Sequence, residues 1–319
     1  MKKTAYVASL LLVLILSSAC HSQPATVEQP VTIRIGYLNI VASLPLFIAE
    51  EKGFLRDEGL KYEASVVATS NQLVDGLVAG NLDAFVESSA VPALAVELQS
   101  PGRVKLISVS EITAEAPFDS LLVKKESKIK SLQDLPGKKI GVFPGSTAGN
   151  LLKKYLMDKG VDVSKSEFLP LPPASQISAL VQGSIDVLHA YEPTTAIALT
   201  TADVRTLSGS VYADMLSPNP QGVAGISSTF LAQHPAEAKR LVRALDRAMV
   251  FMREHDSEAR QIVKSKMQLA DAAAAKVVFL YMVPHSKVDG QVLQRYADML
   301  TGIGELKGHV QVESLIYRD

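Results

Sequence analysis

A seven-residue pattern occurs twice in this chain of 319 residues, as LVAGNLD at residues 77–83 and as LVQGSID at residues 180–186. In each copy, two apolar residues precede a glycine, which favours the left-handed turn that ends a helix. An apolar residue and an aspartate then open a run rich in apolar and β-favouring residues, LDAFVESSA or IDVLHAYE. Each copy therefore predicts a helix, a tight turn and a buried strand.

The stretches upstream of the two copies also correspond. IRIGYLNIVASLPLFIAEEKGF starts at Ile33, and KKIGVFPGSTAGNLLKKYLMDKGV starts at Lys138. Each predicts a strand that ends in Ile-Gly, a polar loop, and an amphipathic helix that ends before Lys-Gly. The equivalent glycines of the Ile-Gly pairs, Gly36 and Gly141, are 105 positions apart. The chain therefore contains two similar α/β units in tandem.

The N-terminus has the three regions of an export signal. Lys2 and Lys3 precede an apolar run that is too short to span a bilayer, and small residues follow it. We expect residues 1–19 to be a signal peptide. Residues 20–30 are polar, contain two prolines and have no periodicity, so we expect a flexible tether.

The signal resembles that of bacterial lipoproteins, in which the first residue after cleavage is an acylated cysteine. Cys20, the only cysteine in the chain, stands at that place. One departure is Ser17, where lipoprotein signals usually have a large aliphatic residue. Ordinary cleavage nearby and an uncleaved anchor are the alternatives to lipidation of Cys20.

Composition narrows the possible functions. Lys and Arg together number 32 and Asp and Glu 33, so no basic excess suggests nucleic-acid binding. A single cysteine allows neither an intramolecular disulfide nor a cysteine-based metal site. The six histidines have no metal-ligand spacing, and no GxSxG motif occurs. We therefore expect no metal, no cofactor and no catalytic residue.

Five stretches together resemble the substrate-binding proteins of bacterial ABC importers, in the group that serves nitrate, sulfonate, taurine and thiamine-precursor pyrimidines. They are IRIGYLNIVASLPLFIAEEKGFLRDEGL, LVAGNLDAF, SLQDLPGKKIGVFPGST, LVQGSIDV and HPAEAKRLVRALDRAM. The resemblance implies the α/β, two-lobed periplasmic-binding-protein fold of type II, with a mixed sheet flanked by helices in each lobe. It also implies a monomer that closes over a small molecule and delivers it to a membrane permease without chemistry.

On this fold, residues 31–112 would form the first part of lobe 1, and residues 113–222 a crossing strand and lobe 2. Residues 223–319 would form a return strand and helices that pack mainly on lobe 1. The hinge would lie near residues 110–121 and 222–227. The protein would be exported, with its body in the periplasm or outside the cell and only its lipid anchor in the membrane.

Polar residues at strand ends of the first unit are candidate ligand contacts, because ligands bind at the carboxyl ends of strands in open α/β sheets. Ser43 is expected to cap the helix that starts at Leu44. For each hydroxyl or amide, a local capping or turn role is the alternative. The candidates are the polar residues Tyr37, Asn39, Ser43, Thr69, Ser88 and Ser89, together with Leu44 at the start of that helix.

In the second unit, Ser146 and Thr147 stand at a predicted helix start, where free N–H groups favour a ligand acceptor atom. Tyr191 and Glu192 match a place where the family often has an aromatic residue and an acid. Tyr191 could stack on a flat ligand. Glu192 could accept hydrogen bonds from a ligand amine or from donors that hold the hinge together.

These residues disagree about the charge of the ligand. The helix start suits an anion, whereas Glu192 and Glu87 oppose one, and no arginine stands at a strand end. We therefore expect a neutral, zwitterionic or amine-bearing ligand rather than a simple anion.

Two other functions remain open at this point. Thiamine-pyrimidine synthases share this fold, but they resemble a cysteine-rich, iron-using type, and this chain has one cysteine, within a predicted export signal. A ligand-sensing subunit of a membrane signalling system is the second alternative.

Overall fold

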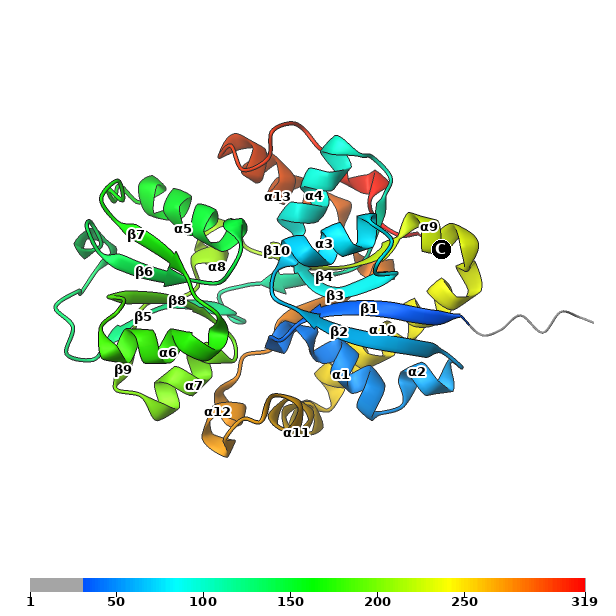
Figure 1. Ribbon diagram of the computed structural model, residues 1–319, viewed down its shortest axis with the longest axis horizontal. Helices are drawn as coiled ribbons and strands as arrows, with labels where there is room; N and C mark the ends of the chain where they lie inside the picture. Colours follow the sequence, from blue (N-terminus) through cyan, green and yellow to red (C-terminus); the bar gives the residue numbers. More distant parts are fainter. Residues whose placement is uncertain (1–30, 319) are drawn as a thin grey trace, which may run out of the picture. The chain divides into compact units, whose positions relative to one another are not determined.

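The computed structural model of the protein describes residues 31–318, so the predicted signal peptide, tether and Cys20 lie outside the described residues. It contains two mixed β-sheets, each flanked by helices (Figure 1). This confirms the predicted α/β class with one mixed sheet in each lobe. Lobe 1 contains the six-stranded sheet and lobe 2 the five-stranded sheet.

The strands of lobe 1, in spatial order, are β11 (Tyr281–Pro284), β4 (Val104–Ile112), β10 (Asn219–Ser227), β3 (Ala84–Ser89), β1 (Thr32–Leu38) and β2 (Lys61–Val67). Those of lobe 2 are β7 (Glu167–Pro170), β6 (Lys139–Val142), β8 (Val187–Tyr191), β5 (Asp119–Lys124) and β9 (Val204–Ser208).

The helices of the first tandem unit are α1 (Leu44–Glu51), α2 (Phe54–Asp57), α3 (Ser70–Val78) and α4 (Ala90–Gln99). Those of lobe 2 are α5 (Ser146–Asp158), α6 (Pro173–Gln182), α7 (Thr194–Thr201) and α8 (Val211–Met215). The remaining helices are α9 (Ser228–Gln233), α10 (Pro235–Glu254), α11 (Asp256–Met267), α12 (Asp271–Lys276) and α13 (Gly290–Gly302). Short 3₁₀ turns cover Val41–Ser43, Leu132–Asp134, His285–Lys287 and Val312–Ser314.

The two tandem units have the same strand pairing. β1 runs parallel to β2 and β3, and β6 runs parallel to β7 and β8. An antiparallel strand then joins each unit, β10 beside β3 and β5 beside β8. The repeat in the sequence is therefore a repeat of architecture.

The aspartates of the repeated motif have the same role in both lobes. The Asp83 carboxylate accepts a hydrogen bond from the Arg34 N–H at 2.8 Å, and the Asp83 N–H donates to the Arg34 carbonyl. The Asp186 carboxylate accepts from the Lys139 N–H at 2.9 Å, and the Asp186 N–H donates to the Lys139 carbonyl. Each aspartate thus holds the start of its strand against the central parallel strand of its sheet.

The glycines of the Ile-Gly pairs are explained by the packing of the motif against the neighbouring strand. A Cβ atom at Gly36 would lie 2.6 Å from Leu82 Cδ1, and one at Gly141 would lie 2.5 Å from Ile185 Cδ1. Leu82 and Ile185 are the apolar residues of the two motif copies. Glycine leaves the space into which that apolar side chain packs.

Replacing Gly141 or Gly36 with alanine should lower the free energy of unfolding by about 1–3 kcal/mol, because the added methyl overpacks a filled core. Urea denaturation measures the change. Gly149→Ala is the matched control, since a Cβ there would lie 3.8 Å from its nearest neighbour and within helix α5. The control should keep or slightly raise stability. Equal losses in all three variants would contradict this account of the motif.

The chain crosses between the sheets after β4, at residues 113–118, and again after α8, at residues 216–218. The first crossing lies within the predicted hinge range. Residues 222–227 were predicted as the second hinge segment. They instead pair with β3 and β4 inside the six-stranded sheet.

Most of the C-terminal region packs on lobe 1, as α10 does on α1 and α13 on β10. Helix α12, in contrast, packs on α7 of lobe 2 (Figure 1). The lobes are therefore linked through this helix as well as through the two crossings.

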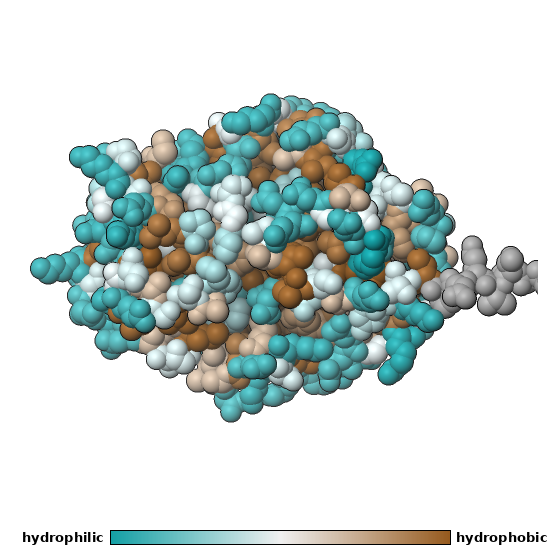
Figure 2. All heavy atoms as spheres, viewed as in Figure 1, coloured by the Kyte–Doolittle hydropathy of each residue, from teal (hydrophilic) through white to brown (hydrophobic). Residues whose placement is uncertain are grey.

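Hydrophilic side chains cover much of the face shown in Figure 2, with hydrophobic ones in smaller areas between them. Within residues 31–318, no helix has both the length and the apolar character needed to cross a membrane.

Candidate functional site

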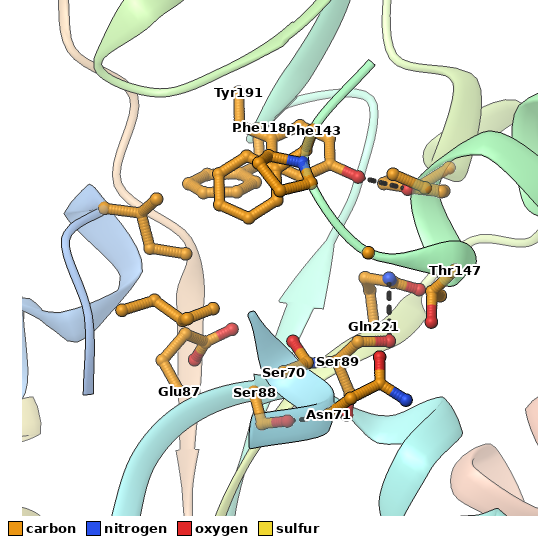
Figure 3. Close-up of a pocket in the computed structure, with 16 residues that line it drawn as sticks. Ser70, Asn71, Glu87, Ser88, Ser89, Phe118, Phe143, Thr147, Tyr191 and Gln221 are labelled. Carbon is orange, nitrogen blue, oxygen red and sulfur yellow. Dashed lines mark hydrogen bonds between the residues drawn. The ribbon is translucent and has the colours of Figure 1, made fainter. Parts of the chain in front are cut away.

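A pocket lies between the two lobes and has a volume of about 50 Å³ (Figure 3). Lobe 1 supplies residues from the ends of β1 and β3, from the start of α3 and from β10, while lobe 2 supplies residues from the ends of β6 and β8 and from the start of α5. The lining consists of Leu38, Ile40, Ser70, Asn71, Glu87, Ser88, Ser89, Phe118, Phe143, Pro144, Gly145, Thr147, Ala148, Tyr191, Tyr212 and Gln221.

Three aromatic rings form one wall of the pocket. The rings of Phe143 and Tyr191 are stacked with centroids 5.2 Å apart, and Phe118 lies 5.6 Å from Tyr191. The Tyr191 hydroxyl lies 2.5 Å from that of Tyr212, so its polar end is satisfied within the protein. The wall can therefore pack against an apolar or flat part of a ligand.

The opposite side of the pocket is polar (Figure 3). The N-terminal ends of three helices meet there: Ser70 and Asn71 begin α3, Ser89 caps α4, and Thr147 lies in the first turn of α5. Helix N-termini present free N–H groups and a partial positive charge. Gln221 of β10 adds an amide, which donates to the Ser89 hydroxyl at 3.2 Å. This side can hold an acceptor-rich or anionic group.

Ser146 and Thr147, predicted as a pair, have different positions. Thr147 is buried and lines the pocket, whereas Ser146 is exposed and is not part of the lining. The helix is preceded by Gly145, whose φ of 99° favours glycine, and no side chain caps it. A Cβ at Gly145 would lie 3.7 Å from the Thr69 side chain, so the two lobes approach closely here.

Glu87 lies on the pocket lining at the end of β3, and its side chain is buried. Its Oε2 accepts a hydrogen bond from the Ser110 hydroxyl at 2.6 Å. Burial raises the pKa of the Glu87 carboxyl to about 8, and the Ser110 hydrogen bond opposes part of that rise. The Glu87 side chain therefore carries a proton in most molecules at neutral pH.

Of the residues predicted in lobe 1, only Ser88 and Ser89 line the pocket. Asn39 is exposed, and Tyr37 packs edge-on against Phe47 with ring centroids 5.5 Å apart. Thr69 caps α3 by accepting from the Gln72 N–H at 3.2 Å.

Ser43 and Leu44 are fully buried and lie outside the pocket lining. Ser43 is the residue before α1, but its hydroxyl donates to the Leu38 carbonyl at 2.7 Å and does not cap the helix. The prediction that it caps α1 is therefore wrong, because the hydroxyl closes the turn after β1 instead. Leu44 belongs to the apolar core.

Tyr191 lines the pocket as expected, but Glu192 does not. The Glu192 carboxylate accepts from the Ala196 N–H at 3.3 Å, and its carbonyl accepts from the Val41 N–H of lobe 1 at 3.4 Å. Burial raises the pKa of Glu192 to about 8, although backbone N–H groups of Ala196 and Val278 and the charge of Arg260 act against the rise. The Ala196 contact lies within lobe 2, and the contact with lobe 1 is made by the Glu192 backbone, so both suggested roles of the side chain stay predictions.

The sequence reasoning noted Ser70 as a hydroxyl at a strand end, and it missed Asn71, Phe118, Phe143, Tyr212 and Gln221 as lining residues. The repeat contains a signal for one of them. Phe143 follows Gly141 by two positions, as Leu38 follows Gly36, and both line the pocket. Nothing local marks Gln221 or Tyr212, because their place depends on the return of the chain to lobe 1.

Residues 41–259, more than half of the chain, match the family model described as NMT1/THI5 like. The chain belongs to the NMT1/THI5 like family. A relative from Bacillus subtilis (strain 168), named as a putative aliphatic sulfonates-binding protein, is 28% identical over 259 residues, which are 79% of this chain and 75% of that protein.

Solved structures match this NMT1/THI5 like protein over almost its whole length. The alkanesulfonate-binding protein SsuA from Xanthomonas axonopodis pv. citri, bound to MOPS, has a TM-score of 0.74 and 21% identity, and covers 91% of this chain and 99% of its own. The periplasmic aliphatic sulphonate-binding protein SsuA from Escherichia coli has a TM-score of 0.71 and 20% identity. It covers 91% of this chain and 93% of its own. These likenesses confirm the two-lobed periplasmic-binding-protein fold.

The same fold also occurs in an enzyme. The desulfurization enzyme DSZB has a TM-score of 0.67 and 17% identity, and covers 90% of this chain and 96% of its own. The same fold therefore supports both binding and catalysis.

Proposed function

We propose that the protein is the substrate-binding component of an ABC importer and captures a small organic molecule with an acidic head group between its lobes. One observation carries the proposal: the N-termini of α3, α4 and α5, from both lobes, meet an aromatic wall in one pocket. The sulfonate-binding names of the Bacillus relative and the SsuA structures support the same class of ligand.

The two sides of the pocket suggest how such a ligand would be oriented. Its acidic group would accept hydrogen bonds at the helix N-termini, and its carbon skeleton would pack on the Phe118, Phe143 and Tyr191 rings. The described lining contains no lysine, arginine or histidine, so a bare inorganic anion would lack both a counter-charge and an apolar contact. An organic molecule that carries its acidic group on an apolar skeleton, zwitterions included, therefore fits better than nitrate.

Glu87 does not oppose an anion as strongly as the sequence suggested. With a pKa of about 8, the Glu87 carboxyl is mostly uncharged at neutral pH. The described lining then carries little negative charge that would repel an acidic ligand.

The proposed role includes export and delivery to a permease. A signal peptide at residues 1–19 and an acylated Cys20 would keep a monomeric body at the outer side of the cell membrane, tethered through residues 20–30. A pocket of about 50 Å³ has room for only a few water molecules. The lobes would therefore have to move apart to admit an organic ligand.

Thr147→Ala should weaken the binding of alkanesulfonates by about tenfold, because a hydrogen bond to a charged ligand group is worth about 1.5–3 kcal/mol. Isothermal titration with ethanesulfonate, propanesulfonate and MOPS measures the affinity, and mass spectrometry checks that the ligand is recovered unchanged. Ser146→Ala, which alters an exposed hydroxyl at the same helix start, is the control and should bind like the unaltered protein. Failure of the unaltered protein to bind any of these compounds would contradict the proposed function.

A further inference from the structure

Gln221 of β10 lines the polar side of the pocket, where Figure 3 shows it with Ser89, Asn71 and Thr147. In the pairing of β10 with β4, the register shifts between Asn219 and Gly222. Irregularities of this kind redirect a side chain and are frequent beside active sites. This irregular segment brings the Gln221 amide to the pocket.

The two ends of the Gln221 amide have different partners. Its oxygen, Oε1, accepts a hydrogen bond from the Tyr296 hydroxyl of α13. Its nitrogen, Nε2, donates to the Ser89 hydroxyl at 3.2 Å. An amide nitrogen carries two hydrogens, and in the part of the chain that the structure describes only Ser89 accepts from this one. The other hydrogen is therefore left for a ligand.

Tyr296 determines which end of the amide faces the pocket. The Ser89 hydroxyl fits either orientation, because it can donate or accept. The Tyr296 side chain is fully buried, and burial raises the pKa of its phenol above the usual value, so the hydroxyl keeps its proton.

Within residues 31–318, the acceptor of the Tyr296 proton is Gln221 Oε1. If the amide were rotated by half a turn, the phenol would meet an N–H group, and its own hydrogen would be buried without a partner. A buried donor without a partner is unfavourable. The amide is therefore held with Oε1 toward α13 and Nε2 toward Ser89 and the pocket.

We infer that Gln221 is a specificity-determining residue and that Tyr296 positions it, so that the amide offers the head group of the ligand a donor and not an acceptor. The oxygens of a sulfonate only accept, and one of them gains a charge-assisted hydrogen bond from Nε2. A sulfonamide is uncharged, and its N–H hydrogens find no acceptor at Gln221. The inference rests on the proposed function, because it concerns the same pocket and the same class of ligand.

Tyr296→Phe tests this role, because it removes the hydroxyl and keeps the buried ring. The Gln221 amide can then rotate and turn its oxygen toward the ligand. Isothermal titration of the purified protein should show propanesulfonate bound about tenfold more weakly. The affinity for propanesulfonamide, which can donate to that oxygen, should change by less than about threefold when measured by displacement of propanesulfonate. An equal loss for both compounds, or no loss for propanesulfonate, would overturn the inference.

Gln221→Met separates positioning from a general effect on the fold. Methionine has a similar length but no amide, so the Tyr296 hydroxyl has nothing to orient. In this background, Tyr296→Phe should change the affinity for propanesulfonate by less than about threefold. A further tenfold loss would mean that Tyr296 acts on the pocket by another route, and it would overturn the inference while leaving the proposed function standing.

Tyr155→Phe is the matched control. It removes a buried phenol hydroxyl that donates to Asp214 at 2.9 Å, and Tyr155 lies outside the pocket lining. This variant should bind both compounds like the unaltered protein. The same losses in Tyr155→Phe and Tyr296→Phe would contradict a specific role of Tyr296.

The orientation of the amide can also be measured without a ligand. In protein that contains isotope-labelled glutamine, the NMR signals of the Gln221 side chain are those that disappear in Gln221→Met. Tyr296→Phe should shift these signals, and Tyr155→Phe should not. Unchanged signals in Tyr296→Phe would overturn the inference, whatever the titrations show. If the unaltered protein binds neither compound, the proposed function fails, and the selectivity inferred for Gln221 fails with it.

Discussion

Replacing Asp119 with alanine is expected to lower the free energy of unfolding by about 3–5 kcal/mol, the usual loss when one member of a buried pair is removed. Asp119 is fully buried at the start of β5. Its Oδ2 lies 2.8 Å from His189 Nε2 and accepts from the Val211 N–H at 2.8 Å, and its Oδ1 accepts from the Ser210 hydroxyl. Removing the carboxylate would leave all three groups without their partner.

Removal of the Asp119 carboxylate should also affect ligand binding. Asp119 directly follows the first crossing, and Ser210 and Val211 begin α8, which precedes the second crossing. One carboxylate thus ties both crossing segments to lobe 2 at the point where Phe118 and Tyr212 enter the pocket. Because domains of this kind are stable by only about 5–15 kcal/mol, the variant should unfold at markedly lower urea concentration.

Asp203→Ala is the control for this prediction. Asp203 is exposed and lies 3.7 Å from the Lys125 ammonium, a surface ion pair whose loss costs about 0–1 kcal/mol. Urea denaturation followed by circular dichroism compares the two variants. Equal stability of Asp119→Ala and Asp203→Ala would show that the Asp119 contacts do not hold the crossing segments.

Stability should fall as the pH rises from weakly acidic to weakly basic, because of Glu87 and Glu192. Burial raises the pKa of both from 4.5 to about 8. Between these values the unfolded chain releases the two protons and the folded protein keeps them, so ionisation favours unfolding. Each residue contributes a loss of up to about 1.4 kcal/mol per pH unit. The loss begins near the unfolded pKa and ends once pH passes the folded pKa.

The variant with both Glu87→Gln and Glu192→Gln should lose much of this dependence, since amide side chains do not ionise. The difference in free energy of unfolding between this variant and the unaltered protein should therefore shift in favour of the variant as the pH rises. Urea denaturation at several pH values measures this difference. Glu254→Gln, at the exposed end of α10, is the control and should follow the unaltered protein. Parallel pH curves for the double variant and the unaltered protein would contradict the raised pKa values.

The sequence repeat predicted the architecture because the same contacts occur in both copies of the motif. Asp83 and Asp186 each hold a strand start, and Gly36 and Gly141 each accommodate an apolar side chain from the neighbouring motif. Both roles require an aspartate or a glycine at a similar position in each copy of the repeat, and this can be read directly from the sequence. Ser88, Ser89 and Tyr191, which the strand-end rule selected, line the pocket, and their contact with a ligand stays a prediction.

The direction of individual side chains was beyond the same reasoning. Ser146 and Thr147 differ in exposure because successive residues of a helix point about 100° apart, so only one faces the pocket. At the end of β3, the left-handed φ of Glu87 interrupts the alternation of strand side chains, and Glu87 lines the pocket together with Ser88.

By itself, the sequence determined the two α/β units and their shared order of strands and helices, because hydrophobic periodicity and glycine turns report local structure. Only the tertiary structure decided which acid faces the pocket. Glu87 and Glu192 both follow strand signals of the repeated motif. Their roles differ because Gly222, on a strand that returns from lobe 2, leaves space beside Glu87, whereas the Ala196 and Val41 backbones surround Glu192.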